Sequence, residues 1–159
     1  MRHNVHKLWH TLPIALITIT LLASCIGNKV YDQYDHTPIA GWEKNDTLLF
    51  SIPPMQQDAL YHSDLLLRIS QSYPFMSLTL IVDQTVWPSR ATRTDTLKCR
   101  LINSDGKSNG QGLSYYQYSF PVTTMRLHKG DSLQISVRHN MKREILPGVS
   151  DIGIQLTRQ

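Results

Sequence analysis

The chain has 159 residues and two cysteines, and it carries 16 Lys and Arg against 12 Asp and Glu, a formal net charge of +4. Two of the basic residues lie in an N-terminal segment that we expect to be removed, which leaves 14 basic side chains against 12 acidic ones and a net charge of +2. The pI near 9.2 therefore gives no reason to expect nucleic-acid binding, and the 135 residues from Cys25 onward are about right for one domain with a single core.

The N-terminal segment has the pattern of an export signal. Two basic residues precede residues 12–22, an apolar run of eleven residues, which is too short to cross a hydrocarbon core of about 30 Å as a helix. The run ends in Leu22-Ala23-Ser24-Cys25, which resembles the lipobox of bacterial lipoproteins, where small residues admit the signal peptidase and the cysteine receives a diacylglycerol thioether. We predict that residues 1–24 are a removed lipoprotein signal peptide and that Cys25 is the lipid attachment site. The alternative is an ordinary cleaved signal that ends near a cysteine.

Lipidation would hold the mature chain at a membrane surface. Burying an acyl chain contributes roughly 0.8 kcal/mol per CH₂ group, and stable anchoring takes two chains or more. With Cys25 acylated, Cys99 is the only remaining thiol, so no intramolecular disulfide can form. Because Cys99 lies between Leu97 and Leu101, we expect its side chain to be a small buried hydrophobic group.

Beyond the signal, residues 25–46 lack helical periodicity and are predicted to form a lipidated tether and a first edge segment around residues 30–35. In residues 47–159 apolar and polar side chains alternate with period two, which is typical of half-buried β-strands. The alternating positions that we expect to face the core are Leu48, Phe50 and Ile52; Leu65, Leu67 and Ile69; Leu78, Leu80 and Val82; Leu97, Cys99 and Leu101; Tyr118, Phe120 and Val122; Leu133, Ile135 and Val137; and Ile152, Ile154 and Leu156. The one candidate for a short helix is residues 55–61.

These segments predict an all-β domain at residues 47–159. Turns rich in Pro and Gly separate seven or eight short strands, and this spacing is typical of a single two-sheet antiparallel β-sandwich. We favour a jelly-roll-like sandwich over an immunoglobulin-like one. The sequence leaves the strand order open.

No motif for a metal site or a catalytic centre is present after the signal. The histidines do not fall at spacings that would bind one ion from one element, and Cys99 is the only thiol there, so we expect no metal and no cofactor. Residues 112–116 begin like a nucleophile elbow but lack its closing glycine. We therefore predict that the protein is not an enzyme and has no small-molecule substrate.

A hydrolase with two carboxylates facing across a cleft remains an alternative, because such pairs form in space and not in sequence. The aspartates, however, are predicted at strand ends, where Asp caps turns and where no apolar setting would raise a carboxyl pKa. They are Asp64, Asp83, Asp95, Asp131 and Asp151.

Two surface features suggest binding. Trp42, Trp87, Tyr115 and Tyr116 could form an aromatic platform on which sugar rings stack, although half-buried aromatic side chains are also common at sandwich edges. Residues 138–143 concentrate positive charge that could meet lipid phosphates or an acidic partner, or could form a solvated loop.

An Asp followed by Thr or Ser and an apolar residue occurs three times. These segments resemble the O-glycosylation acceptor of Bacteroidetes and make Thr47, Thr96 and Ser132 candidate modification sites. Each of them is predicted to open a strand. The alternative is that the Asp caps a turn and the hydroxyl residue begins the strand.

A series of short motifs runs in order along the mature chain. It comprises Tyr31-x-x-Tyr34, Pro38-Ile39-x-Gly41-Trp42, Leu67-Arg68-Ile69, Tyr73-Pro74-Phe75, Gly110-x-Gly112-Leu113-Ser114 and the tail Met141-x-x-x-x-Leu146-x-Gly148-x-x-Asp151-x-Gly153. The series resembles the gliding motility lipoproteins of the GldH family. It spans nearly the whole mature chain, and the lipobox agrees with it.

The resemblance implies a lipoprotein of the gliding motility and associated protein secretion machinery, with a non-catalytic assembly or stabilising role. Its implied partners are other gliding or secretion lipoproteins and envelope proteins, and Cys25 is the one site residue that carries over. Ile26, in place of an Asp, favours the outer membrane. The lack of an acidic cluster after Cys25 favours a periplasm-facing body over one on the cell surface. The alternative function is a glycan-binding surface lipoprotein.

Overall fold

The computed structural model describes residues 28–159, which contain ten β-strands and no helix. The strands are β1 (Lys29–His36), β2 (Trp42–Glu43), β3 (Leu48–Ile52), β4 (Ala59–Ser70), β5 (Ser77–Trp87), β6 (Ala91–Arg100), β7 (Tyr115–Leu127), β8 (Ser132–His139), β9 (Ile145–Leu146) and β10 (Val149–Arg158). Within residues 28–159 there is accordingly no helical segment that could cross a membrane. The predicted signal peptide and Cys25 lie outside the described residues.

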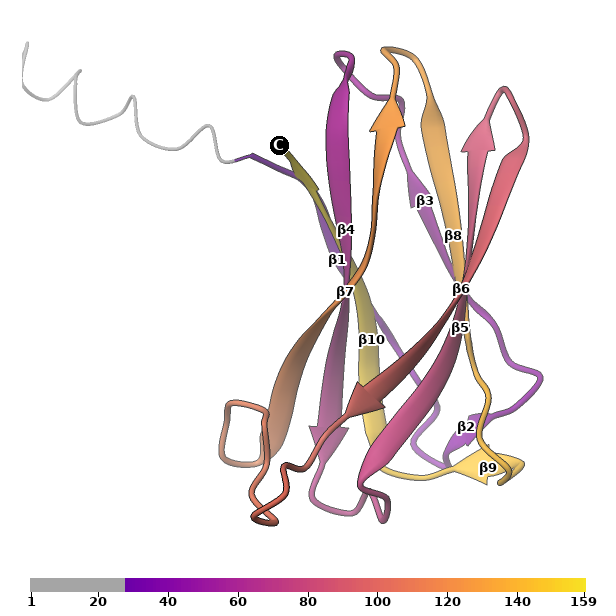
Figure 1. Ribbon diagram of the computed structural model, residues 1–159. Helices are drawn as coiled ribbons and strands as arrows, with labels where there is room; N and C mark the ends of the chain where they lie inside the picture. Colours follow the sequence, from indigo (N-terminus) through magenta and orange to yellow (C-terminus); the bar gives the residue numbers. More distant parts are fainter. Residues whose placement is uncertain (1–27) are drawn as a thin grey trace, which may run out of the picture.

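The eight longer strands form two antiparallel four-stranded sheets that lie face to face (Figure 1). One sheet has the order β1-β10-β4-β7 and the other has the order β3-β8-β5-β6, while β2 and β9 form a small separate pair. This is the strand order of a jelly roll, in which eight strands divide between two sheets. The predicted all-β, jelly-roll-like sandwich is confirmed.

The core lies between the sheets and is built from the alternating apolar positions. In β5, Leu78, Leu80 and Val82 are fully buried while the residues between them are half-exposed. Burying each such side chain contributes about 1.5–3 kcal/mol. The expected thiol position is confirmed, because Cys99 is fully buried and burial raises its pKa to about 12.

The edge segment expected around residues 30–35 is confirmed as β1, which pairs with β10 at the edge of its sheet and contributes Tyr31 to the common core. The strands of the sandwich therefore begin before residue 47. The short helix considered at residues 55–61 is absent. Its apolar residues belong to a loop and a strand: Met55 is buried in the loop between β3 and β4, and Tyr61 is a core residue of β4.

The sandwich has two distinct ends. At the end drawn at the top of Figure 1, which we call the tether end, β1 begins beside the C-terminus, and the Arg158 amide donates to the Asn28 carbonyl at 2.7 Å. The opposite end, which we call the loop end, carries residues 37–41, 71–76, 101–114 and 140–148. Since β7 has 13 residues, the two ends lie roughly 40 Å apart.

Candidate interaction surfaces

Trp42 anchors the connections at the loop end. The pair β2 and β9 aligns Trp42 with Leu146, and both side chains are fully buried. The indole Nε1 donates to the Asp46 carbonyl at 3.0 Å, so the one polar atom of the buried ring has a partner. The indole also packs against the His139 ring in a T-shaped arrangement, with centroids 5.3 Å apart. The connections at the loop end therefore pack on the buried Trp42 side chain, which we call the base of the loop end.

His139 is held in its neutral form by this packing. Its Nε2 lies 3.2 Å from the Trp42 carbonyl, and the Met141 amide donates to Nδ1 at 3.4 Å. A neutral ring that donates from Nε2 and accepts at Nδ1 satisfies both contacts. Burial lowers the pKa of His139 below its ordinary value, and this effect outweighs the opposing effect of the bond to Trp42. His139 is therefore a structural side chain.

Above this base the loop end exposes large apolar side chains. Ile39 and Leu113 are 108% and 90% exposed, and the others are Met76, Tyr115 and Ile145. Ile39 and Tyr115 line one hollow of about 530 Å³. Exposed apolar side chains scattered singly are normal, whereas several at one end of a domain make that end a candidate contact surface.

Gly148 fixes two of these loops against each other. Its φ of +81° is one that L side chains rarely adopt, and a Cβ there would lie 2.5 Å from the Tyr73 nitrogen. The Ser70 amide donates to the Gly148 carbonyl at 2.8 Å. The turn before β10 and the loop before β5 are thus held in close backbone contact, which only glycine permits.

A second cluster lies on the outer face of the β1-β10-β4-β7 sheet. The Arg68 guanidinium stacks over the Tyr34 ring at 4.0 Å, and Gly153 beneath the ring has no room for a Cβ, which would lie 2.8 Å from a ring carbon. His36 pairs with the Asp151 carboxylate, which is almost fully buried. The contacts of this cluster link β1, β4 and β10 across the sheet.

The aspartates do not all lie where the sequence suggested. Asp64, Asp83 and Asp95 are inside strands, because the solvent-facing rows of a sheet accept charged side chains as readily as turns do. Asp83 accepts hydrogen bonds at 2.6 Å from both Thr94 and Arg138. These bonds, the one from Thr94 first, hold the pKa of the Asp83 carboxyl below its ordinary value. This lowered pKa is the reverse of what a general acid needs.

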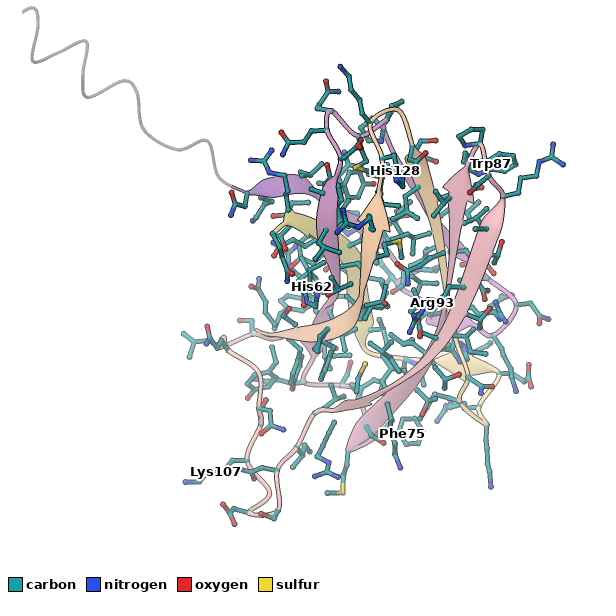
Figure 2. All side chains as sticks on the ribbon, turned by 45° about the horizontal axis from the view of Figure 1, so that its top comes forward. His62, Phe75, Trp87, Arg93, Lys107 and His128 are labelled. Carbon is teal, nitrogen blue, oxygen red and sulfur yellow. The ribbon has the colours of Figure 1, made fainter. Side chains whose placement is uncertain are left out.

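The aromatic platform does not assemble. Trp42 is buried in the core, because the β2 and β9 pair covers it. Trp87 is 39% exposed at the tether end, whereas Tyr115 and Tyr116 begin β7 at the loop end. Figure 2 shows Trp87 far from Phe75, which lies at the loop end. These side chains cannot stack on one sugar chain of ordinary size.

The candidate glycosylation sites differ in position. Thr47 is exposed directly before β3, Ser132 is half-buried as the first residue of β8, and Thr96 is exposed. Thr96 lies in the middle of β6 and does not open a strand, contrary to the expectation. Modification at these three positions remains a prediction.

The basic segment at residues 138–143 is divided by the fold. Arg138 pairs with Asp83 and His139 is buried, so Lys142 and Arg143 are the exposed cations of the segment. Sequence reasoning missed Lys98 and Arg100, which the fold brings to the same region. Their spacing on outward positions of β6 was the available signal.

No group of three or more His, Cys, Asp or Glu side chains that could hold a metal ion occurs within residues 28–159.

The sequence is similar to known lipoproteins over most of its length. A model of the family described as GldH lipoprotein matches residues 29–156. The gliding motility lipoprotein GldH of Flavobacterium johnsoniae is 31% identical over 154 residues, covering 92% of this chain and 95% of that protein. A gliding motility lipoprotein GldH homolog of Christiangramia forsetii is 22% identical, covering 91% and 93%.

Similarity to solved structures is weaker. A family GH115 4-O-methyl-alpha-glucuronidase matches with a TM-score of 0.41 and 14% identity, covering 86% of this chain and 18% of that chain. A family 35 carbohydrate binding module from Clostridium thermocellum matches with a TM-score of 0.38 and 10% identity, covering 83% and 98%. These scores support no conclusion about ligand or activity.

Proposed function

Because this chain belongs to the GldH lipoprotein family, we propose that it is an outer-membrane lipoprotein with a non-catalytic assembly or stabilising role in the gliding motility and associated secretion machinery. It is a lipid-anchored protein of the cell envelope, with Cys25 as the attachment site. Its body faces the periplasm, where it contacts other gliding or secretion lipoproteins.

The observation that carries the assembly role is the apolar surface of the loop end. Five of the nine large apolar side chains that are exposed in residues 28–159 lie there, at the end opposite the tether. Ile39, Met76 and Ile145 lie in connections that Trp42 and Gly148 hold in place. The Leu113 carbonyl accepts a hydrogen bond from the Gln71 side chain at 3.0 Å. A rigid apolar surface loses little conformational freedom on binding and is therefore suited to a lasting contact.

Co-purification from the native host tests this role. The protein with a C-terminal tag is extracted in detergent, and Ile39→Asp/Leu113→Asp is compared with Leu49→Asp/Leu60→Asp, which makes the same change away from the loop end. We expect the native protein and the second variant to recover other gliding or secretion lipoproteins, and the first variant to lose them. Thermal unfolding checks that both variants are folded.

The results separate the parts of the proposal. A native protein that elutes as a monomer without partners would refute the assembly role, and equal loss in both variants would refute the loop end as its site. Cys25→Ala should release the protein from the membrane fraction. Digestion of the body by protease added to intact cells would contradict the periplasmic orientation.

A further inference from the structure

Two adjoining hollows lie where the outer face of the β3-β8-β5-β6 sheet meets the loop end. The first, of about 370 Å³, is lined by Lys98 and Arg100, and the second, of about 400 Å³, is lined by Lys142 and Arg143. Ser77, the first residue of β5, lines both of them. We call this surface the basic trough.

The strand register explains why the four basic side chains meet. Arg100 pairs with Ser77 and Lys98 pairs with Thr79, so β6 places both cations on one side of β5. On the other side the Asn140 amide donates to the Thr79 carbonyl at 2.8 Å, which brings the loop after β8 alongside. Since neighbouring strands lie about 4.8 Å apart, the two basic flanks are separated by about 10 Å.

The trough carries positive charge without a carboxylate to balance it. Lys98, Arg100, Lys142 and Arg143 are all exposed, and none of them takes part in an ion pair within residues 28–159. No described Asp or Glu side chain lines either hollow. In contrast, Arg93 and Arg138 of the same sheet pair with carboxylates at 2.8 and 2.6 Å. The trough therefore presents a positive field that an anionic partner would neutralise.

The position of the trough indicates what kind of anion it meets. Cys25 precedes Lys29 by four residues, so a tether from a lipid at Cys25 spans at most about 14 Å. With the tether end toward the membrane, the trough lies roughly 40 Å away, beyond the phosphates of that membrane. Met76, which is 62% exposed, lines the trough as well, and Met and Arg are enriched where proteins contact one another.

We propose that the basic trough binds an acidic segment of a partner protein. This inference rests on the proposed function, because it takes the chain to be anchored at Cys25 and to work by contact with envelope proteins. The four cations select the partner by charge, and the apolar side chains of the loop end supply the adjacent contact area.

Fluorescence anisotropy with the lipidated protein in neutral detergent tests the binding. The probe is a labelled peptide of alternating Glu and Ala, and a peptide of alternating Gln and Ala is the uncharged control. We expect the acidic peptide to bind and added salt to weaken the binding. Lys98→Glu/Arg100→Glu and Lys142→Glu/Arg143→Glu should each weaken it at least about tenfold.

Arg126→Glu/Lys129→Glu is the matched control, because it makes the same charge change at the tether end. Its affinity should stay close to that of the native protein. Equal binding of the two peptides, or equal losses in the trough and control variants, would overturn the proposal. Tighter binding to phosphatidylcholine vesicles that contain phosphatidylglycerol than to the acidic peptide would also overturn it, since the ligand would then be a lipid surface.

Co-purification in the native host separates this inference from the proposed function. Loss of partners in both trough variants, with retention in the control variant, supports the trough. If the trough variants recover the same partners as the native protein, the trough is wrong and the assembly role stands. If the native protein itself recovers none, the proposed function fails.

Discussion

The same strands run to both ends of the sandwich, but the connections between them differ at the two ends. At the tether end the loop at 53–58 and the turn at 128–131 are tied by main-chain bonds, such as those of Met55 with Asp131 and Gly130 at 2.8 and 2.9 Å. At the loop end longer connections rest on Trp42 and leave apolar and basic side chains in solvent. The contact surface that we propose therefore lies on the connections at the loop end.

The strongest test of this contrast compares the two tryptophans. Trp42→Ala should destabilise the protein by about 3–5 kcal/mol, because it removes a fully buried ring and leaves a cavity under the loops. Trp87→Ala should cost less than about 1 kcal/mol, because that ring is partly exposed at the tether end. Urea denaturation measures both. Similar losses would mean that Trp42 does not anchor the loop end.

The next largest difference in stability is expected between alanine substitutions at two glycines with positive φ. Gly148→Ala should cost about 3 kcal/mol, since the new Cβ adds a clash with the Tyr73 backbone to the strained conformation. Gly130→Ala at the tether end should cost about 1 kcal/mol, because nothing lies within 4 Å of its Cβ position. Denaturant midpoints of both variants test this, and a reversed order would contradict the close contact of the loops.

The loop end should also be the more acid-sensitive of the two. Because burial lowers the pKa of His139 in the folded state, the unfolded chain binds the proton more readily. The stabilisation is therefore complete above the ordinary pKa of 6.5 and is lost as the pH falls below it through the folded pKa. The charge of Lys44 also lowers the pKa of His139, whereas the charge of Glu144 raises it.

Urea denaturation at a series of pH values measures this effect. The native protein should lose more stability between neutral and mildly acidic pH than His139→Gln does. His128→Gln, which removes an exposed histidine at the tether end, is the matched control for the loss of one imidazole. An unchanged profile in His139→Gln would argue against a buried neutral ring.

The smallest expected effect on stability is a difference between two cations of the basic segment at residues 138–143. Arg138→Ala should cost about 0.5–1 kcal/mol, because it removes a partly exposed ion pair with Asp83. Lys142→Ala should change stability by less than about 0.5 kcal/mol, because its side chain is exposed and takes part in none of the ion pairs of residues 28–159. Thermal unfolding distinguishes the two. A cost for Lys142→Ala as large as that for Arg138→Ala would show that the trough contributes to folding.

Local patterns in the sequence predicted the core well. The alternation in β3, β5 and β8 gave both the strands and their buried faces, because a strand with one dry face must repeat with period two. The edge strand β7 fits less closely: Tyr118 and Phe120 are only partly buried, since an edge strand has a neighbour on one side only. Alternation reveals which side chains share a face and not how deeply that face is covered.

The sequence by itself determined the all-β class, the inward and outward rows, the position of Cys99 in the core and the resemblance to a lipoprotein family. The tertiary structure alone decided that Trp42 is an anchor beneath the loops and that Lys98 and Arg100 lie across β5 from Lys142 and Arg143. The physical reason is that periodicity is a property of a single strand. Which strands become neighbours in a jelly roll depends on pairings between segments far apart in the chain, and those pairings bring the residues of a surface together.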